Sequence, residues 1–222
     1  MNTLAYLQSF ELVNEQLFPK IKFNKLRTEL FLKGICWTDS IDGKFNEQDD
    51  FRVVLYLKKN VNGIDYNNPI VVECNGMVLE YSTQFKWKLL VVPNENCTKV
   101  KVSPKQMNKF YQEKKYQIYE VLDATIFNMY YYKGLWRIST CKGYDVTDFT
   151  FVNNKTYAQV FTEINYIKYP KFKMDQLDLS NCYTFAMRTS EFHLFDETKY
   201  MQNFNYNYNY YIKLMKVTNL NS

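Results

Sequence analysis

The amino-acid sequence predicts an α+β protein whose sheets are mainly antiparallel and flanked by a few helices. The middle of the 222-residue chain contains short apolar segments, rich in β-branched and aromatic residues, that are separated by polar turns. Two other segments repeat apolar residues at helical spacing. Hydrophobic residues make up 46% of the chain, enough for a core without disulfides or metals. We expect a single domain over residues 1–222, beginning with a helical region over residues 1–45.

Taken in order, the elements alternate between short strands and isolated helices. Residues 3–18 and 155–166 are predicted helices because their apolar side chains recur every three or four positions. A third helix is predicted over 104–115, where Ser103 and Pro104 form a capped start. Lys133-Gly134 forms the turn of a meander. The predicted strands are 51–57, 69–74, 76–81, 87–92, 117–123, 125–132, 135–140, 182–189 and 210–217.

Charge and cysteine content narrow the classes of function. A net charge of +5, from 28 basic and 23 acidic residues, is low for a dedicated duplex-DNA binder. The five cysteines form no Cys-x-x-Cys pair and the chain has one histidine, so no zinc site is expected. No stretch approaches the roughly 18 apolar residues of a transmembrane helix, and the N-terminus lacks the features of a signal peptide. We therefore expect no membrane association and no secretion, and a cytoplasmic or virion-associated protein.

Four segments, in this order, carry a pattern of ligase motifs. Residues 73–80 read Glu-Cys-Asn-Gly-Met-Val-Leu-Glu, and residues 121–127 read Val-Leu-Asp-Ala-Thr-Ile-Phe. Residues 136–143 end in a Lys-Gly pair, and residues 183–190 contain Thr-Phe-Ala-Met-Arg. In order and spacing they resemble the bacteriophage-type RNA ligase 1 family, ATP-dependent ligases of the nucleotidyltransferase superfamily. The resemblance implies that family's nucleotidyltransferase core from about residue 50 onward.

Several positions depart from the family pattern. The resemblance implies a lysine nucleophile where Val121 stands, and a glycine where Ala124 follows Asp123. Only a deprotonated amine can attack the α-phosphorus of ATP to form a phosphoramidate, and valine offers no such group. Asn75 replaces an arginine, which removes a fixed charge.

The later motifs are also incomplete. Met187, or Arg188 in a shifted register, stands where the family has a glutamate, and the two last motifs have no counterpart before Ser222. We therefore expect no catalytic residue, no metal site and no adenylyl transfer by this chain. ATP and magnesium would be its cofactors only if it were nevertheless a ligase.

Four residues remain as candidates for nucleotide or RNA binding. Lys142 would face the nucleotide in the family, although a turn lysine beside Gly143 is an equal alternative. Asp123 could contact a ribose hydroxyl or cap a turn. Arg137 could contact phosphate, and Trp136 could stack on a base or fill the core of a sheet.

Tyrosines near the C-terminus suggest a protein interface. In a strand, Tyr206, Tyr208 and Tyr210 would share one face, because successive side chains alternate. Tyrosine is enriched at interfaces, which makes a protein partner or a homo-oligomer the expected assembly.

Three functions follow from the sequence. The first is a catalytically inactive RNA-ligase-like module that serves as a structural or interaction subunit of a larger assembly, such as a viral one. The second is a non-catalytic protein that binds RNA or a nucleotide. The third is the N-terminal part of a split ligase that another chain completes.

Overall fold

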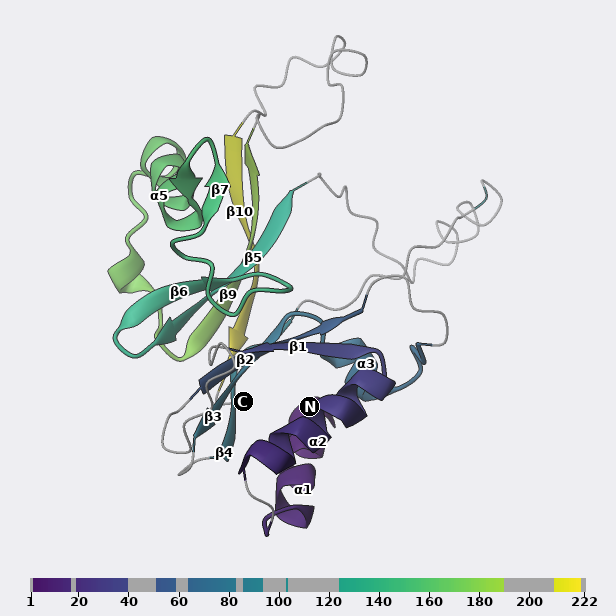
Figure 1. Ribbon diagram of the computed structural model, residues 1–222. Helices are drawn as coiled ribbons and strands as arrows, with labels where there is room; N and C mark the ends of the chain where they lie inside the picture. The colour runs from purple at the N-terminus through teal and green to yellow at the C-terminus, as the bar shows by residue number, and fades with distance from the viewer. Residues whose placement is uncertain are drawn as a thin grey trace, which may run out of the picture.

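Two four-stranded sheets form the centre of the computed structural model in Figure 1, which describes residues 2–16, 19–39, 51–58, 64–82, 86–93, 103, 124–189 and 210–220. Sheet A has the strand order β1-β2-β3-β4 and sheet B the order β10-β9-β5-β6. All neighbouring strands in both sheets are antiparallel. The predicted α+β class with mainly antiparallel sheets is confirmed.

The strand bounds follow the apolar segments of the sequence closely. Sheet A consists of β1 (Ile35–Asp39), β2 (Phe51–Leu57), β3 (Met77–Ser82) and β4 (Lys86–Val91). Sheet B consists of β5 (Thr125–Tyr132), β6 (Leu135–Ser139), β9 (Asn181–Thr189) and β10 (Tyr210–Asn219), and a small ribbon pairs β7 (Thr150–Val152) with β8 (Lys155–Thr156). The predicted turn between β5 and β6 is confirmed, since Lys133 and Gly134 have φ values of 46° and 85°.

Helices cover the outer face of each sheet. Helices α1 (Asn2–Val13), α2 (Pro19–Leu32) and α3 (Pro69–Glu73) accompany sheet A, and α5 (Tyr157–Lys168) with the 3₁₀ turn η1 (Met174–Gln176) accompanies sheet B. Apolar residues of α1 and α2 share one core with sheet A, and those of α5 share a second core with sheet B. A third cluster, which includes Val54, Val78, Tyr130 and Cys182, packs the two sheets against each other.

Helix α5 shows how local sequence fixes an element. Thr156 accepts a hydrogen bond from the backbone N–H of Gln159 at 3.2 Å, and the Gln159 side chain accepts one from the Thr156 N–H at 2.8 Å. This capping box starts the helix, and Val160, Phe161 and Ile164 then bury one face against sheet B. The helix predicted over 155–166 is confirmed, with its start two residues later because 155 and 156 form β8.

One predicted strand is wrong. Residues 69–74 were expected to be a strand because of their β-branched residues, but Pro69–Glu73 is the short helix α3. Asn68 caps it by accepting a hydrogen bond from the Ile70 N–H at 3.1 Å, and Pro69 stands at the first helical position, where its missing N–H costs nothing. Local capping therefore outweighs β-propensity here.

The N-terminal region differs from the expectation in its length and content. The first helix ends at Val13, which is 83% exposed, rather than at residue 18. A second helix, α2, follows, and the strand β1 lies inside the range 1–45 that was expected to be helical. The predicted helix 104–115 and strand 117–123 lie outside the described residues. Within the described part of the chain, no helix has the length and apolarity needed to cross a membrane.

A buried ion pair attaches the N-terminal helices to sheet A. Lys22 of α2 donates to the carboxylate of Glu11 in α1, and both side chains are 5% exposed. The hydroxyl of Tyr81 on β3 donates to the same carboxylate at 3.0 Å, and the Lys86 ammonium lies 3.6 Å from it. One carboxylate therefore connects α1, α2, β3 and β4.

Removing this carboxylate tests its contribution. In the Glu11→Ala variant, Lys22 keeps a buried charge without its anion, so we expect the free energy of unfolding to fall by about 3–5 kcal/mol. Glu15→Ala is the matched control, because Glu15 is exposed beyond the end of α1. Urea denaturation of both variants measures the difference, and equal stabilities would contradict this role for Glu11.

Candidate functional site

Alternate residues of β2 point toward sheet B. Phe51, Val53 and Leu55 belong to the core under the helices, whereas Val54 belongs to the cluster between the sheets. Arg52, next to Val53, therefore projects to the same side as Val54. An arginine in an otherwise apolar strand brings a charge into the interior, and that charge needs partners from sheet B.

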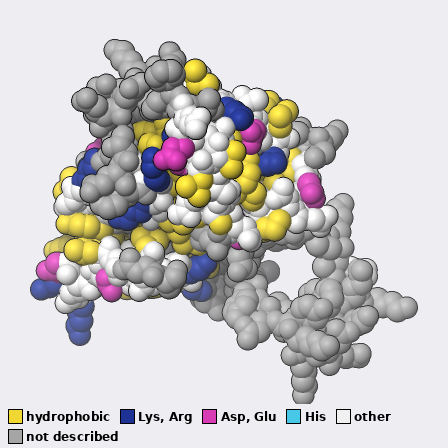
Figure 2. Space-filling model, turned by 90° about the horizontal axis from the view of Figure 1, so that it is seen from below, with side chains coloured by type: hydrophobic (Ala, Val, Ile, Leu, Met, Phe, Trp, Pro, Cys, Tyr) yellow, Lys and Arg dark blue, Asp and Glu magenta, His cyan; other side chains and the backbone are white. Residues whose placement is uncertain are grey.

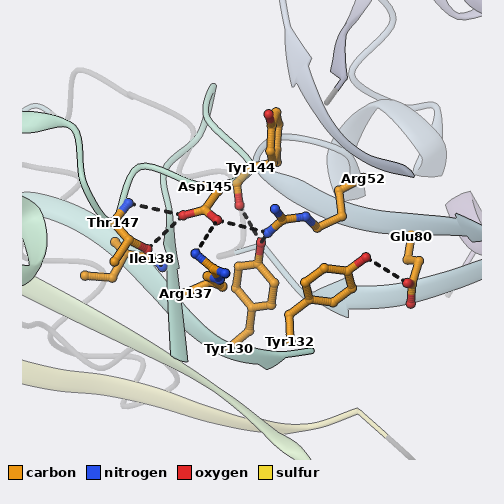
Figure 3. Close-up of polar contacts among 9 residues, drawn as sticks. All are labelled: Arg52, Glu80, Tyr130, Tyr132, Arg137, Ile138, Tyr144, Asp145 and Thr147. Atoms are coloured by element: carbon orange, nitrogen blue, oxygen red, sulfur yellow. Dashed lines mark hydrogen bonds and ion pairs between the residues drawn. The ribbon is translucent and has the colours of Figure 1, made fainter. Parts of the chain in front are cut away.

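Asp145, in the loop after β6, supplies the partner charge. Its Oδ2 lies 3.2 Å from the Arg52 Nη1 and 3.4 Å from the Arg137 Nη1 of β6 (Figure 3). Its Oδ1 accepts hydrogen bonds from the N–H and the hydroxyl of Thr147, at 3.2 and 2.8 Å. The side chains of Arg52 and Asp145 are only 14% and 15% exposed. One carboxylate thus joins an arginine of each sheet.

Tyrosine side chains complete the surroundings of Arg52. The Arg52 Nη1 donates to the Tyr130 hydroxyl at 2.9 Å, and this hydroxyl donates to the Tyr144 carbonyl at 2.5 Å. The guanidinium also lies over the rings of Tyr132 and Tyr144, at 4.4 and 5.0 Å from their centroids. The Tyr132 hydroxyl donates to Glu80 of β3 at 2.9 Å, a second link between the sheets. We call Arg52, Tyr130, Arg137, Tyr144 and Asp145 the inter-sheet cluster.

The pKa shifts of Tyr130 and Arg52 show how burial and neighbouring charges act on these two groups. Burial raises the pKa of the Tyr130 hydroxyl far above its ordinary value, although Arg52 opposes this shift. Burial by itself lowers the pKa of Arg52, but Tyr130 and Asp145 raise it to above its ordinary value. Near neutral pH, Tyr130 is therefore a neutral hydrogen-bond donor and Arg52 a permanent cation.

The structure brings two of the candidate binding residues toward this cluster and separates a third. Arg137 is a member of the cluster. Lys142 is exposed in the loop after β6, with its Nζ 5.6 Å from the ring centroid of Tyr56 on β2. Trp136 instead packs against Tyr131 and Tyr183 on the face of sheet B that carries α5. It therefore cannot share a site with Arg137 or Lys142.

The remaining predicted residues cannot be placed in this site. Asp123, Val121, Tyr206 and Tyr208 lie outside the described residues. Tyr210 begins β10, but its side chain is not among those described. Their roles stay predictions.

The segment that resembles the Glu-Cys-Arg-Gly motif has structural contacts throughout. Glu73 accepts hydrogen bonds from the Thr3 N–H at 3.0 Å and the Thr3 hydroxyl at 3.2 Å, and so caps the start of α1. The Asn75 side-chain oxygen accepts from the Leu57 N–H at 3.2 Å, at the end of β2. Asn75, which stands where the resemblance implies an arginine, thus supports a strand end.

Gly76 allows the loop after β6 to approach sheet A. Its φ is +89°, a conformation that L side chains rarely adopt, and its N–H donates to the Leu55 carbonyl at 2.7 Å. A Cβ at this position would lie 3.2 Å from the Cα of Cys141. The glycine therefore positions the loop that carries Lys142 and Asp145.

Met187 and Arg188, the two residues that could stand at the position of the missing glutamate, have different surroundings. Met187 is fully buried in the core beneath α5. Arg188 is also buried, but it lies on the opposite face of β9, because neighbouring strand residues alternate. That face also carries Thr184, whose hydroxyl donates to Asn128 of β5 at 2.8 Å. Arg188 is therefore on the face toward the inter-sheet region, and Met187 is not.

Sequence reasoning missed Arg52, Asp145 and Tyr144. A signal existed for Arg52, since a single arginine inside Phe-Arg-Val-Val-Leu-Tyr-Leu predicts a buried charge that requires a carboxylate. A weaker signal existed for Asp145, because Asp-x-Thr is a typical side-chain-stabilised turn. Nothing local in the sequence identifies one as the partner of the other across 93 positions.

Comparisons with known proteins point to RNA ligases. A protein named "Putative RNA-ligase" from African swine fever virus (isolate Pig/Kenya/KEN-50/1950) is 25% identical over 133 residues, which cover 52% of this chain and 29% of the viral protein. A protein named RNA ligase from Rhodothermus phage RM378 is 27% identical over 160 residues, which cover 60% of this chain and 36% of the phage protein.

The similarity covers only part of each relative. The chain spans about a third of the length of the curated relatives it matches. No family model matches the chain, and no solved structure matches it. The chain is distantly related to RNA-ligase-like proteins of viruses and phages.

Neutralising Asp145 tests the inter-sheet cluster. In the Asp145→Asn variant, Arg52 and Arg137 lose their shared anion, and we expect the free energy of unfolding to fall by about 2–4 kcal/mol. Asp148→Asn is the control, because Asp148 is exposed three residues later. Thermal unfolding of the two variants should differ clearly, and equal melting temperatures would show that Asp145 does not hold the sheets together.

Proposed function

We propose that this chain is an RNA-ligase-like module that does not transfer adenylyl groups and that serves as an interaction subunit of a larger, viral assembly. In this proposal, residues 1–222 form one nucleotidyltransferase-like domain, related to the bacteriophage-type RNA ligase 1 family. A cytoplasmic or virion-associated location fits such a subunit. The distant relationship to viral and phage ligases supports the module's origin.

One observation carries the proposal. Polar residues in the segments that resemble ligase motifs contact other residues of this chain. Glu73 caps a helix, Asn75 supports the end of a strand, and Arg137 is paired with Asp145. These side chains already have partners within the fold, so contact with a nucleotide would compete with those internal contacts. This arrangement favours a structural role over a catalytic one.

The chemistry of the nucleophile position supports the same conclusion. Val121 stands where the resemblance implies the lysine that forms a covalent adenylate. Loss of a covalent nucleophile raises the barrier of such a reaction by about 8 kcal/mol or more. Ala124 further replaces the glycine of the same motif.

Incubation with radiolabelled ATP and Mg²⁺ tests this proposal directly. We expect no covalent adenylate on the chain, while an active phage RNA ligase treated in parallel becomes labelled. Label on any lysine would overturn the proposal. Label on this chain that appears only with a second polypeptide present would instead support the split-ligase alternative.

A second candidate function, non-catalytic binding of RNA or a nucleotide, is favoured by one specific observation. Arg52, Arg137 and Lys142 are three cations of the inter-sheet region, whereas Asp145 provides the carboxylate that two of them share. Lys142 is exposed beside the ring of Tyr56. A lysine next to an aromatic ring suits a phosphate with a stacked base.

Substituting Lys142 distinguishes this candidate. If the chain binds RNA there, Lys142→Ala should weaken binding of a labelled single-stranded RNA and lower its salt dependence by about one phosphate contact. Lys133→Ala is the control, because Lys133 is exposed in the β5–β6 turn. Fluorescence anisotropy at several salt concentrations measures both effects. No binding of the unmodified protein at about 50 mM salt would exclude this candidate.

A further inference from the structure

Strand β10 forms one edge of sheet B. Among the described residues its only strand neighbour is β9, and the strand runs for ten residues from Tyr210 to Asn219. An edge strand of this length leaves a row of backbone N–H and C=O groups that can pair with an added strand. The Tyr169 hydroxyl, just after α5, donates to the Ile212 carbonyl at 3.0 Å, so a tyrosine side chain already lies against this strand.

Large apolar side chains are exposed along the same edge. An edge strand that only borders solvent typically carries polar residues. Here four such side chains are each about half exposed, at 47%, 49%, 53% and 47%: Tyr169, Leu214, Met215 and Val217. We call these four residues with the β10 backbone the β10 edge surface. Three exposed apolar side chains on one strand, with Tyr169 bonded to the same strand, indicate a contact surface.

Charge around the β10 edge surface has one dominant sign. Strand β10 carries two lysines, Lys213 and Lys216, and no acidic residue. The face of the molecule seen from below shows exposed hydrophobic side chains among charges of both signs (Figure 2). Lysines on the same strand as exposed apolar side chains suit a partner segment with acidic residues.

The same lysines argue against a second copy as the occupant. If two β10 strands paired, Lys213 and Lys216 of one chain would lie near lysines of the other, and like charges across a strand pair are destabilising. Lysine on an edge strand is a common device against self-pairing. The lysines therefore favour a strand from a different protein over a second copy of β10.

We propose that the β10 edge surface binds an extended, acidic segment of a partner protein, which adds to sheet B as a further strand. Acidic residues of the segment face Lys213 and Lys216, and its apolar residues cover Leu214 and Val217. This inference rests on the proposed function, because it names the surface through which the interaction subunit engages its partner.

Selection from a displayed library of random twelve-residue peptides tests the inference. We expect enriched peptides to alternate acidic with apolar residues and to bind the Lys213→Glu/Lys216→Glu variant at least tenfold more weakly. Lys25→Glu/Lys58→Glu is the matched control, because it makes the same change of charge at α2 and at the end of β2, and it should bind as the unmodified protein does. Circular dichroism confirms that both variants fold.

The outcomes separate the two proposals. Enriched peptides that lack acidic residues, or that bind the β10 variant unchanged, would overturn the β10 edge surface while leaving an interaction role elsewhere intact. A dimer in light scattering that the β10 variant dissociates would identify a second copy as the occupant and also overturn the inference. A monomer that enriches no peptide would contradict this inference, and if it also captures no stable protein partner, the interaction role itself fails.

Discussion

The carboxylate of Asp145 constrains how the two sheets meet, because it pairs with an arginine from each of them. Arg52 comes from sheet A and Arg137 from sheet B, and both guanidinium groups converge on Asp145 in a region where side chains are largely removed from water. Unpaired charges in such a region are costly, so these arginines constrain the loop that supplies the anion. That loop is fixed in turn on β6, because the Ile138 N–H donates to the Thr147 hydroxyl oxygen at 2.9 Å and the Val146 N–H donates to the Ile138 carbonyl at 2.7 Å.

The same loop carries the Lys-Gly pair that resembles a ligase motif, and close packing limits it on two sides. Gly76 admits the Cys141 backbone from the side of sheet A, and a Cβ at Gly143 would lie 2.4 Å from the Cγ1 of Val146. Both glycines are therefore explained by packing within this chain. A motif glycine that satisfies a structural requirement does not by itself indicate a bound nucleotide.

Much of the fold could be predicted from the sequence, but little of the site could. Strands such as β2 and β5 match their apolar segments because side-chain alternation and polar turns are local signals. Helix α3 was mispredicted because the cap at Asn68 and the proline after it outweigh a short run of β-branched residues. The inter-sheet cluster depends on residues from distant strands whose pairing is set by the packing of the sheets, so the sequence did not predict that Arg137 and Arg52 share Asp145. The sequence also could not separate Trp136 from Arg137, although their alternation on β6 places them on opposite faces.

The inter-sheet cluster and the β10 edge both carry basic residues, but these residues have different surroundings. The difference bears on both candidate functions. In the inter-sheet cluster, Asp145 already offsets much of the charge of Arg52 and Arg137, so a phosphate binding there would compete with an intramolecular anion held at short distance. Lys142, which is exposed at the edge of this region, is the cation that an external phosphate could reach without that competition. At the β10 edge, where β9 is the one strand neighbour among the described residues, the exposed Lys213 lies on the same strand as exposed apolar side chains. A protein segment can use all three features, whereas a phosphate backbone can use only the charge, and the edge therefore favours a protein partner.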